Sequence, residues 1–336
     1  MLNEQFISIL RCPISGQKLK YKKTVKIAND YPNHNYVLVS EDDRYEYDVI
    51  NSIPRFVPKS NYTDNFGMQW NYFRKTQLDS YSGYPISADR FWGATGWTPE
   101  MIKDKLVLDV GCGSGRFAEI ALIAGAKVVA LDYSSATDAC LDNLRDYPNL
   151  FVVQGDIYQL PFAPSTFDFI YSLGVLQHTP NVKSAFFSLP NMLKKEGFLC
   201  VDYYWKRFIT MMNLKYLVRP ITTKINQKWL FKFLKFYVPV ALPISSFLRK
   251  IPFIGKVLQR FILIVDYSGV YPLSKKQIQE WALLDTFDML APAYDNPQNF
   301  NEVKGWMTDA NFENVEVLHV GHLVTRGKLK SIQISR

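Results

Sequence analysis

Residues 106–122 read LVLDVGCGSGRFAEIAL, and this stretch decides which class of fold the chain can adopt. An apolar run that is typical of a buried strand leads into Gly111, Gly113 and Gly115, and an amphipathic stretch follows. Glycines in such a turn allow the backbone to approach a ligand closely at the start of a helix. The stretch therefore predicts a strand, a ligand-binding turn and a helix.

The alternation of strand and helix continues along the chain. Five short apolar runs are separated by stretches that are compatible with helices: KLVLDV (105–110), KVVALD (127–132), LFVVQGD (150–156), FDFIYSLG (167–174) and FLCVDYYW (198–205). This rhythm predicts an α/β fold with a doubly wound, Rossmann-like and mostly parallel sheet. Residues 312–320 and 322–328 predict an antiparallel hairpin at the edge of that sheet. Ligands of such sheets bind beyond the carboxyl ends of the strands.

The spacing of the glycines distinguishes between two cofactors. A dinucleotide-binding turn has the pattern GxGxxG, whereas this turn is GxGxG, with Arg116 at the position of the expected third glycine. Asp109 lies two residues before Gly111, where a carboxylate would repel a pyrophosphate but suits an ammonium group. We therefore expect S-adenosylmethionine, which has an ammonium and a sulfonium group and no phosphate, rather than NAD.

Two further acids end the next two strands of the pattern. Asp132 ends KVVALD, where its carboxylate can accept hydrogen bonds from both hydroxyls of a ribose. Asp156 ends LFVVQGD, where a carboxylate can accept a hydrogen bond from the exocyclic amine of adenine. The alternative for each acid is an N-cap of the helix that follows it.

Residues 105–205 resemble class I S-adenosylmethionine-dependent methyltransferases, and more narrowly the group that includes the ubiquinone and menaquinone methyltransferases. The motifs that carry the resemblance are VLDVGCGSG, VVALD, VQGDIYQLPF, FDFIYSLGVLQHTPN and LKKEGFL. It implies that Asp109 and the glycine turn hold the methionine end of the cofactor. The cofactor-binding residues that it implies are Asp109, Gly111, Cys112, Gly113, Gly115, Asp132, Tyr133, Asp156, Ile157, Leu173 and Gly174.

Residues 1–60 predict a small β-rich module. YVLVSEDDRYEYDVI (36–50) is typical of two strands around an acidic turn, and NSIPRFVP (51–58) ends it with prolines. Together with LRCPISGQKL (10–19), this segment resembles the small Trm112-like zinc-ribbon family, whose pattern near the start is CPxC. Cys12 is present here, but Ser15 stands in place of the second cysteine. We therefore expect a degenerate zinc-ribbon-like module that folds without a metal.

Residues 61–104 are rich in aromatic and polar residues and have two interpretations. One is a helix and loop that pack on the next domain, and the other is a flap over an active site. The candidate flap residues combine rings with hydrogen-bonding groups: Tyr62, Gln69, Trp70, Arg74 and Gln77.

His178, which lies in GVLQHTPN beyond the fourth apolar run, is the candidate catalytic base. An alcohol that accepts a methyl group needs a general base, whereas a carboxylate or a stabilised carbanion needs little help. The alternative is a structural histidine in the turn from strand to helix. His319 and His322 lie in the predicted hairpin and are expected to be structural or exposed, and His34 belongs to the N-terminal module.

The segment 206–265 carries the whole basic excess of the chain. The net charge is +8, and this segment has twelve Lys and Arg residues and no Asp or Glu. Lys228, Lys232 and Lys235 share a helical face and are interleaved with aromatic residues. The uncharged run 236–248 contains two prolines and is too short to span a bilayer. The segment predicts a helical lid that packs on its own domain or meets a membrane or an anionic substrate.

The predicted organisation is a module over 1–60, an aromatic linker or flap over 61–104, and a class I methyltransferase domain over 105–336 that includes the basic lid 206–265. The four cysteines form no CxxC pair, and MLNEQFISILRCP has no sustained apolar stretch. We therefore expect a cytoplasmic protein, with a peripheral contact to the inner membrane face as one use of the lid.

Several acceptor classes are compatible with these motifs. DNA is not among them, because SLGVLQHTP replaces the NPPY-like element of adenine-N6 enzymes and no Pro-Cys dipeptide of a cytosine-C5 nucleophile occurs. RNA is not an expected acceptor either, although a basic patch can bind phosphates. We expect methylation of oxygen on a small or lipid-linked acceptor, such as a saccharide or isoprenoid intermediate. The alternatives are C-methylation of a quinone-like ring and a non-catalytic S-adenosylmethionine-binding partner protein at the membrane.

Overall fold

The computed structural model of the chain describes residues 3–23, 36–58, 61–208, 213–252, 254–259 and 261–331. His34 and Arg260, which entered the predictions from sequence, lie outside these residues.

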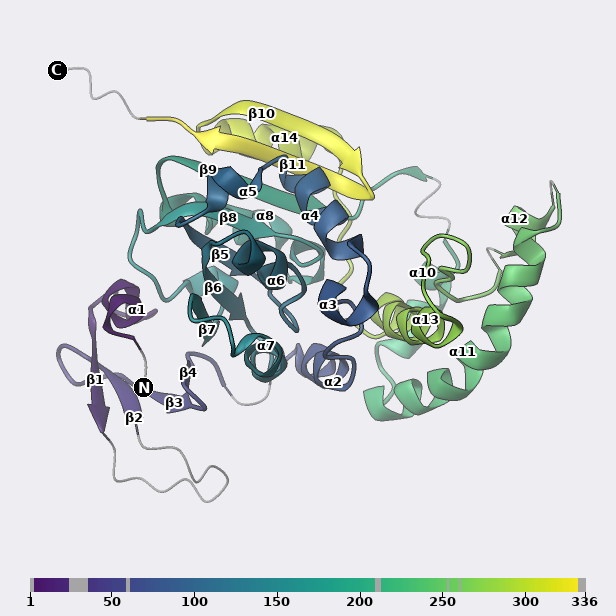
Figure 1. Cartoon of the computed structure of the whole chain (residues 1–336), viewed down its shortest axis with the longest axis horizontal. Helices are drawn as coiled ribbons and strands as arrows, with labels where there is room; N and C mark the ends of the chain where they lie inside the picture. Colours follow the sequence, from purple (N-terminus) through teal and green to yellow (C-terminus); the bar gives the residue numbers. More distant parts are fainter. Residues whose placement is uncertain are drawn as a thin grey trace.

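The centre of the molecule is a seven-stranded sheet in the order β10-β11-β9-β8-β5-β6-β7 (Figure 1). Its strands are β5 (Leu106–Val110), β6 (Lys127–Asp132), β7 (Leu150–Gln154), β8 (Phe167–Ser172), β9 (Leu193–Tyr203), β10 (Phe312–Val320) and β11 (His322–Leu329). Strands β5 to β9 are parallel, whereas β11 is antiparallel to both β9 and β10. The predicted doubly wound sheet with an antiparallel hairpin at its edge is confirmed.

Helices cover both faces of the sheet because the side chains of each strand alternate between the two faces. In β5, Val107 joins an apolar cluster with α4, α6 and α7, whereas Leu108 and Val110 join a second cluster with α8 and α14. The helices on the sheet are α4 (Ile86–Thr95), α5 (Pro99–Ile102), α6 (Arg116–Ile123), α7 (Ala136–Leu144), α8 (Val182–Phe187) and α14 (Phe300–Asp309). The strand order reverses between β5 and β8, which is where sheets of this kind bind ligands.

The N-terminal module docks on the β7 edge of the sheet (Figure 1). It consists of α1 (Glu4–Ile9) and an antiparallel sheet of β1 (Leu19–Lys23), β2 (Tyr36–Ser40), β3 (Glu46–Ile50) and β4 (Ile53–Pro54). Phe6 stacks on Phe151 with ring centroids 4.6 Å apart, and Arg55 Nη2 lies 2.6 Å from Asp138 Oδ1. Cys12 is buried, and among the described residues no group of three or more His, Cys, Asp and Glu side chains could hold a metal ion. The resemblance to zinc ribbons stays a prediction.

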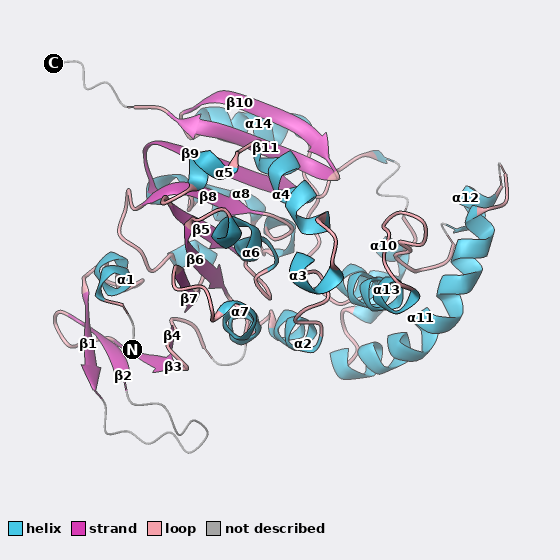
Figure 2. Ribbon diagram, in the orientation of Figure 1, coloured by secondary structure: helices cyan, strands magenta, loops and turns pink. Residues whose placement is uncertain are grey.

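A helical insertion between β9 and α14 lies beside the sheet (Figure 2). It contains α10 (Lys215–Thr222), α11 (Gln227–Arg249), α12 (Gly255–Gln259) and α13 (Lys275–Leu290). Trp205 and Gln298 form a parallel bridge, so the insertion leaves and re-enters the domain at adjacent points. One side of α11 packs on α13 in a separate apolar cluster. The helical unit therefore extends past residue 265 and includes α13.

Helix α11 contains Pro239 and Pro243 in its interior and continues through the uncharged run 236–248. Figure 1 shows α11 as a curved helix, as expected where prolines remove hydrogen bonds from the helical ladder. By length and composition alone this helix could cross a membrane, and 33% of its apolar window is buried inside the protein. Core helices of soluble proteins can be equally long and apolar. Length and composition therefore do not decide whether α11 contacts a membrane.

Candidate active site

A cavity of about 580 Å³ lies at the carboxyl ends of the parallel strands. Residues that follow β5, β6, β7 and β8 form one side of it, and α2 (Asp64–Tyr72), α10 and α13 contribute the other. Nine of the candidate cofactor residues line this cavity: Gly111, Cys112, Gly113, Asp132, Tyr133, Asp156, Ile157, Leu173 and Gly174. The topology thus brings together residues that are far apart in the sequence.

The turn after β5 has a backbone that glycine adopts most easily. The φ angles of Gly111, Gly113 and Gly115 are +82°, +53° and +92°. A Cβ atom on Gly111 would lie 2.4 Å from the Val175 side chain, and one on Gly113 would lie 3.2 Å from the Trp70 ring. Side chains at these positions would fill the space over the turn, so the cavity depends on the glycines.

Two carboxylates border the cavity next to this turn. Asp132 Oδ2 accepts a hydrogen bond from the Gly113 amide at 2.9 Å, and its Oδ1 accepts two from Ser134. Asp156 accepts a hydrogen bond from the Tyr158 amide at 2.9 Å, which is the N-cap role that the sequence left open. Burial raises the pKa of both aspartates above the usual value. Ligand groups that donate hydrogen bonds, such as hydroxyls and amines, fit both positions.

Two predicted cofactor residues lie behind the turn and do not line the cavity. Asp109 is 2% exposed within β5, and burial raises its pKa to about 8. Gly115 is the N-cap of α6, where a Cβ atom would lie 2.6 Å from Leu144. Asp109 is therefore not part of the cavity lining, and its buried Oδ2 has no hydrogen-bond partner among the described residues, so its contact with the methionine end of the cofactor stays a prediction.

The segment 61–104 covers part of the cavity. Four of its five candidate residues line the wall: Tyr62, Gln69, Trp70 and Gln77. Arg74 is the exception, because it lies beyond the end of α2 and forms an ion pair with Asp142 of α7 (Nη1–Oδ2 3.1 Å). Both polar side-chain atoms of Gln69 are buried and have no hydrogen-bond partner within the described ranges. An amide in this state is available to a ligand.

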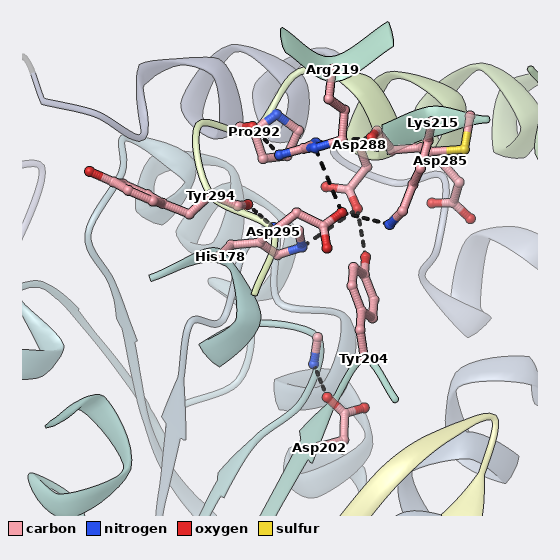
Figure 3. Close-up of polar contacts among 12 residues, drawn as sticks. His178, Asp202, Tyr204, Lys215, Arg219, Asp285, Asp288, Pro292, Tyr294 and Asp295 are labelled. Carbon is pink, nitrogen blue, oxygen red and sulfur yellow. Dashed lines mark hydrogen bonds and ion pairs between the residues drawn. The ribbon is translucent and has the colours of Figure 1, made fainter. Parts of the chain in front are cut away.

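His178 lines the cavity from the 3-10 turn η2 (Leu176–His178) that follows β8. Its Nδ1 lies 3.0 Å from the carbonyl oxygen of Tyr294 (Figure 3). Because a carbonyl can only accept, Nδ1 carries the proton of the neutral ring and Nε2 keeps its lone pair. Nε2 is buried without a hydrogen-bond partner in the described part of the chain and lies 4.0 Å from Asp288 Oδ2. The hydrogen bond from Nδ1 thus orients the ring, and Nε2 remains available to accept a proton.

Helix α10 holds the loop that carries the Tyr294 carbonyl. Lys215 Nζ lies 2.6 Å from Asp295 Oδ2, and Arg219 Nε lies 3.9 Å from the same atom (Figure 3). Arg219 also donates hydrogen bonds to the carbonyl oxygens of Met289, near the end of α13, and Pro292, in this loop. These contacts fix the position of the group that orients His178.

The cavity wall also contains charged and aromatic residues that were not predicted as site residues from the sequence, and we call this set the polar chamber. It consists of Phe66, Arg90, Arg116, Tyr204, Tyr267, Tyr271, Trp281, Asp285, Asp288 and His322. Asp285 and Asp288 are three residues apart on α13 and share a helix face, which is a signal that the sequence offered. His319 and His322, which were expected to be structural or exposed, both border the cavity.

Burial sets the protonation of the polar chamber. It raises the pKa of Asp285 from 3.8 to about 6, although Tyr267 and Gln77 donate hydrogen bonds to the carboxylate. It lowers the pKa of His322 from 6.5 to about 4, so this ring is neutral at physiological pH. Burial, with the nearby positive charges, also lowers the pKa of Arg116 to about 10, which leaves it cationic. The chamber thus combines a cation, a titratable acid and neutral rings.

Part of this chain is similar in sequence to known methyltransferases. Residues 108–201 match the model of the methyltransferase domain family. The tRNA U34 carboxymethyltransferase of Ruthia magnifica subsp. Calyptogena magnifica is 32% identical over 106 residues, which cover 30% of this chain and 33% of that protein. The sterol 24-C-methyltransferase of Pneumocystis carinii is 33% identical over 110 residues, which cover 30% and 27%. The ubiquinone biosynthesis O-methyltransferase of Photobacterium profundum is 35% identical over 96 residues, which cover 28% and 41%.

The matched segment spans roughly a third of the length of these relatives and covers all or most of each parallel strand from β5 to β9, with the glycine turn. The bare turn, the two bordering carboxylates and the unpartnered Gln69 amide fit a nucleoside with an amino-acid end and no phosphate. The chain therefore contains a class I S-adenosylmethionine-dependent methyltransferase domain, and S-adenosylmethionine is its cofactor.

Proposed function

We propose that the protein methylates a hydroxyl oxygen of a small or lipid-linked acceptor, such as a saccharide or an isoprenoid intermediate. The observation that carries the proposal is the free Nε2 of His178, which lies beside the cavity while Nδ1 donates to a carbonyl. A hydroxyl acceptor needs such a base, because its proton must leave as the oxygen attacks.

The cofactor side of the cavity supports a bound S-adenosylmethionine. Asp132 would accept hydrogen bonds from its ribose and Asp156 from its adenine amine, with residues 111–113 against the ligand. When bound, this cofactor supplies a methyl group that its sulfonium already activates. The protein's own contribution is then to orient the acceptor, exclude water and receive a proton.

His178 would receive the hydroxyl proton on Nε2 and become a cation whose Nδ1 still donates to Tyr294. Asp288, at 4.0 Å, stabilises that cation, and Tyr204 Oη lies 3.4 Å from the same carboxylate oxygen. The rings of Phe66 and Tyr204 flank the imidazole with centroids 5.4 Å away, which restricts its rotation. The base is therefore oriented by a carbonyl, a carboxylate and two rings.

The polar chamber supports an acceptor with several hydroxyl groups. Aromatic rings and charged groups lie next to each other there, as a saccharide with apolar C–H faces and polar edges requires. A quinone-like ring that receives the methyl group on carbon is the alternative. The aromatic lining suits it too, and one of the relatives is a sterol C-methyltransferase.

The test measures cofactor binding and turnover separately. Wild-type protein is incubated with methyl-labelled S-adenosylmethionine and fractions of an extract of the producing cells, and the labelled product is recovered. His178→Ala should lower turnover by about 10²–10⁴-fold and leave the calorimetric affinity for S-adenosylmethionine unchanged. Asp288→Asn keeps the base and removes the nearby charge, so its loss should be smaller.

The outcomes separate the alternatives. Full turnover in His178→Ala would show that the histidine is structural and would refute the role as a base. Hot hydriodic acid releases methyl iodide from an O-methyl product and not from a C-methyl product, so retention of the label would establish C-methylation. Cofactor binding without transfer to any fraction would indicate a non-catalytic binding protein.

A further inference from the structure

The outer side of α11 exposes a continuous apolar stripe. Its members follow the helical period and face away from α13: Trp229, Phe233, Phe236, Val240, Ile244 and Phe247. Trp229, Phe236 and Phe247 are 70%, 78% and 66% exposed. Leu217 and Ile221 of α10 are exposed as well. Exposed apolar surface of this extent marks a site of interaction.

Cations lie along the same stripe. Lys228, Lys232 and Lys235 are exposed on α11, and Lys224 and Lys250 are exposed just before and after it. No acidic residue occurs anywhere between positions 206 and 265. The surface therefore combines apolar side chains with uncompensated positive charge.

Three of the basic residues of this segment serve the fold instead. Lys215 and Arg219 contact Asp295, and Arg249 Nη2 lies 3.0 Å from Asp266 Oδ2. The basic residues that pair with buried acids are thus distinct from those that flank the apolar stripe. Lys235 Nζ lies 4.7 Å from the centroid of the Tyr72 ring, but none of the three lysines on α11 pairs with an acid in the described part of the chain, so their charge is available to a partner outside it.

The geometry points to the face of an anionic lipid bilayer, and we propose that the outer side of α10 and α11 lies in its headgroup region. A helix with aromatic residues on one face and lysines beside them suits this position. A spanning orientation does not fit, because Leu230, Leu234 and Val238 pack against α13 and would have to leave it. Figure 1 shows α11 as the outermost long helix beside α13, so a flat bilayer can reach it.

The surface is continuous with the active-site cavity. Trp205, Arg207, Lys215 and Tyr216 line the cavity, and α10 continues from there to the exposed Leu217 and Ile221. A protein bound in this way holds the cavity next to the headgroups. Lipid binding does not depend on which atom is methylated, so it can be tested without an acceptor.

The experiment is flotation of the full chain with vesicles of phosphatidylcholine alone or mixed with phosphatidylglycerol, at low and high salt. Wild type should float only with the anionic vesicles. Because one lysine near an anionic surface strengthens binding about fivefold, the triple change K228E, K232E and K235E should weaken binding by at least about 100-fold. The triple change W229S, F233S and F236S should also weaken it and make the remainder salt-sensitive.

A matched charge control replaces three exposed lysines elsewhere, K105E, K195E and K304E, and should float like wild type. Circular dichroism and S-adenosylmethionine affinity check that every variant is folded. The proposal is overturned if wild type does not float with anionic vesicles, or if the control loses as much binding as the α11 variants. Binding that survives alkaline carbonate extraction would indicate a spanning helix, and a dimer without lipid binding would indicate a protein interface. Either result also overturns it.

Discussion

Replacing Asp285 by asparagine should change how the free energy of unfolding depends on pH. Burial raises the pKa of this carboxyl from 3.8 to about 6 in the folded protein. The folded state therefore holds the proton more tightly than the unfolded state. Its contribution to stability is fully present below pH 3.8 and is lost as the pH rises through 6. The Asp285→Asn variant has no carboxyl to ionise and should not show this loss.

The magnitude follows from the difference between the two pKa values. A difference of about two corresponds to about 3 kcal/mol, and about 2 kcal/mol of it falls between pH 4.5 and 7.5. These are upper values, because the carboxyl faces a cavity that water can enter. The asparagine oxygen can keep only part of the hydrogen bonding from Tyr267 and Gln77, which costs about 1 kcal/mol at every pH. The variant should thus gain stability relative to wild type as the pH rises.

The assay is urea unfolding of both proteins at several pH values between 4.5 and 7.5. His322 acts in the opposite direction, since its lowered pKa removes stability as the pH falls from 6.5 to about 4. It is present in both proteins, so it cancels in the difference. Asp309→Asn, which removes an exposed carboxylate, controls for the loss of one charge. A difference between wild type and Asp285→Asn that is constant with pH, or that changes in the other direction, would refute the reasoning.

The remaining predictions concern the cofactor and the loop behind His178. Asp132→Ala should weaken S-adenosylmethionine binding by about 1.5–3 kcal/mol, because a charged acceptor of hydrogen bonds is lost. Calorimetry that finds an unchanged affinity, or tight binding of NAD to wild type, would contradict the cofactor site. Lys215→Ala leaves the buried Asp295 with the more distant Arg219 and the Tyr216 hydroxyl, and should lower the free energy of unfolding by about 3 kcal/mol. Adding Asp295→Asn should restore part of that loss in urea unfolding, and no rescue would show that the ion pair is not the cause.

The fold could be predicted from the sequence because its signals are local. Each strand from β5 to β9 coincides with one apolar run, and the hairpin of β10 and β11 follows from two runs around a single glycine, Gly321. The extent of α11 did not follow from such local signals. Prolines are unfavourable inside a helix, but packing of the inner side of α11 on α13 keeps the helix continuous through Pro239 and Pro243.

The candidate site was predictable where a residue lies at the carboxyl end of a strand or a short distance beyond it, as for Asp132, Asp156 and His178. Asp109 lies one position before the end of β5 and is buried, and its position in the strand alone did not show whether its carboxyl borders the cavity. Arg90 and His322 could not be found, since only the tertiary arrangement brings α4 and β11 to the cavity. The contact between His178 and the carbonyl oxygen of Tyr294 could not be predicted from the sequence, because every residue has a main-chain carbonyl.

The bridge between Trp205 and Gln298 has a consequence for how such a protein can evolve. Everything between these two residues leaves and returns through one narrow neck, so its length and composition can change without altering the register of the strands. The glycine turn, Asp132 and Asp156 lie outside this segment, whereas Asp285 and Asp288 lie within it. Of the polar chamber, Phe66, Arg90, Arg116 and His322 also lie outside this segment. An exchange of the segment at the neck would therefore replace Tyr294 and Asp288 beside His178, together with Asp285, while the cofactor-binding turn stays the same.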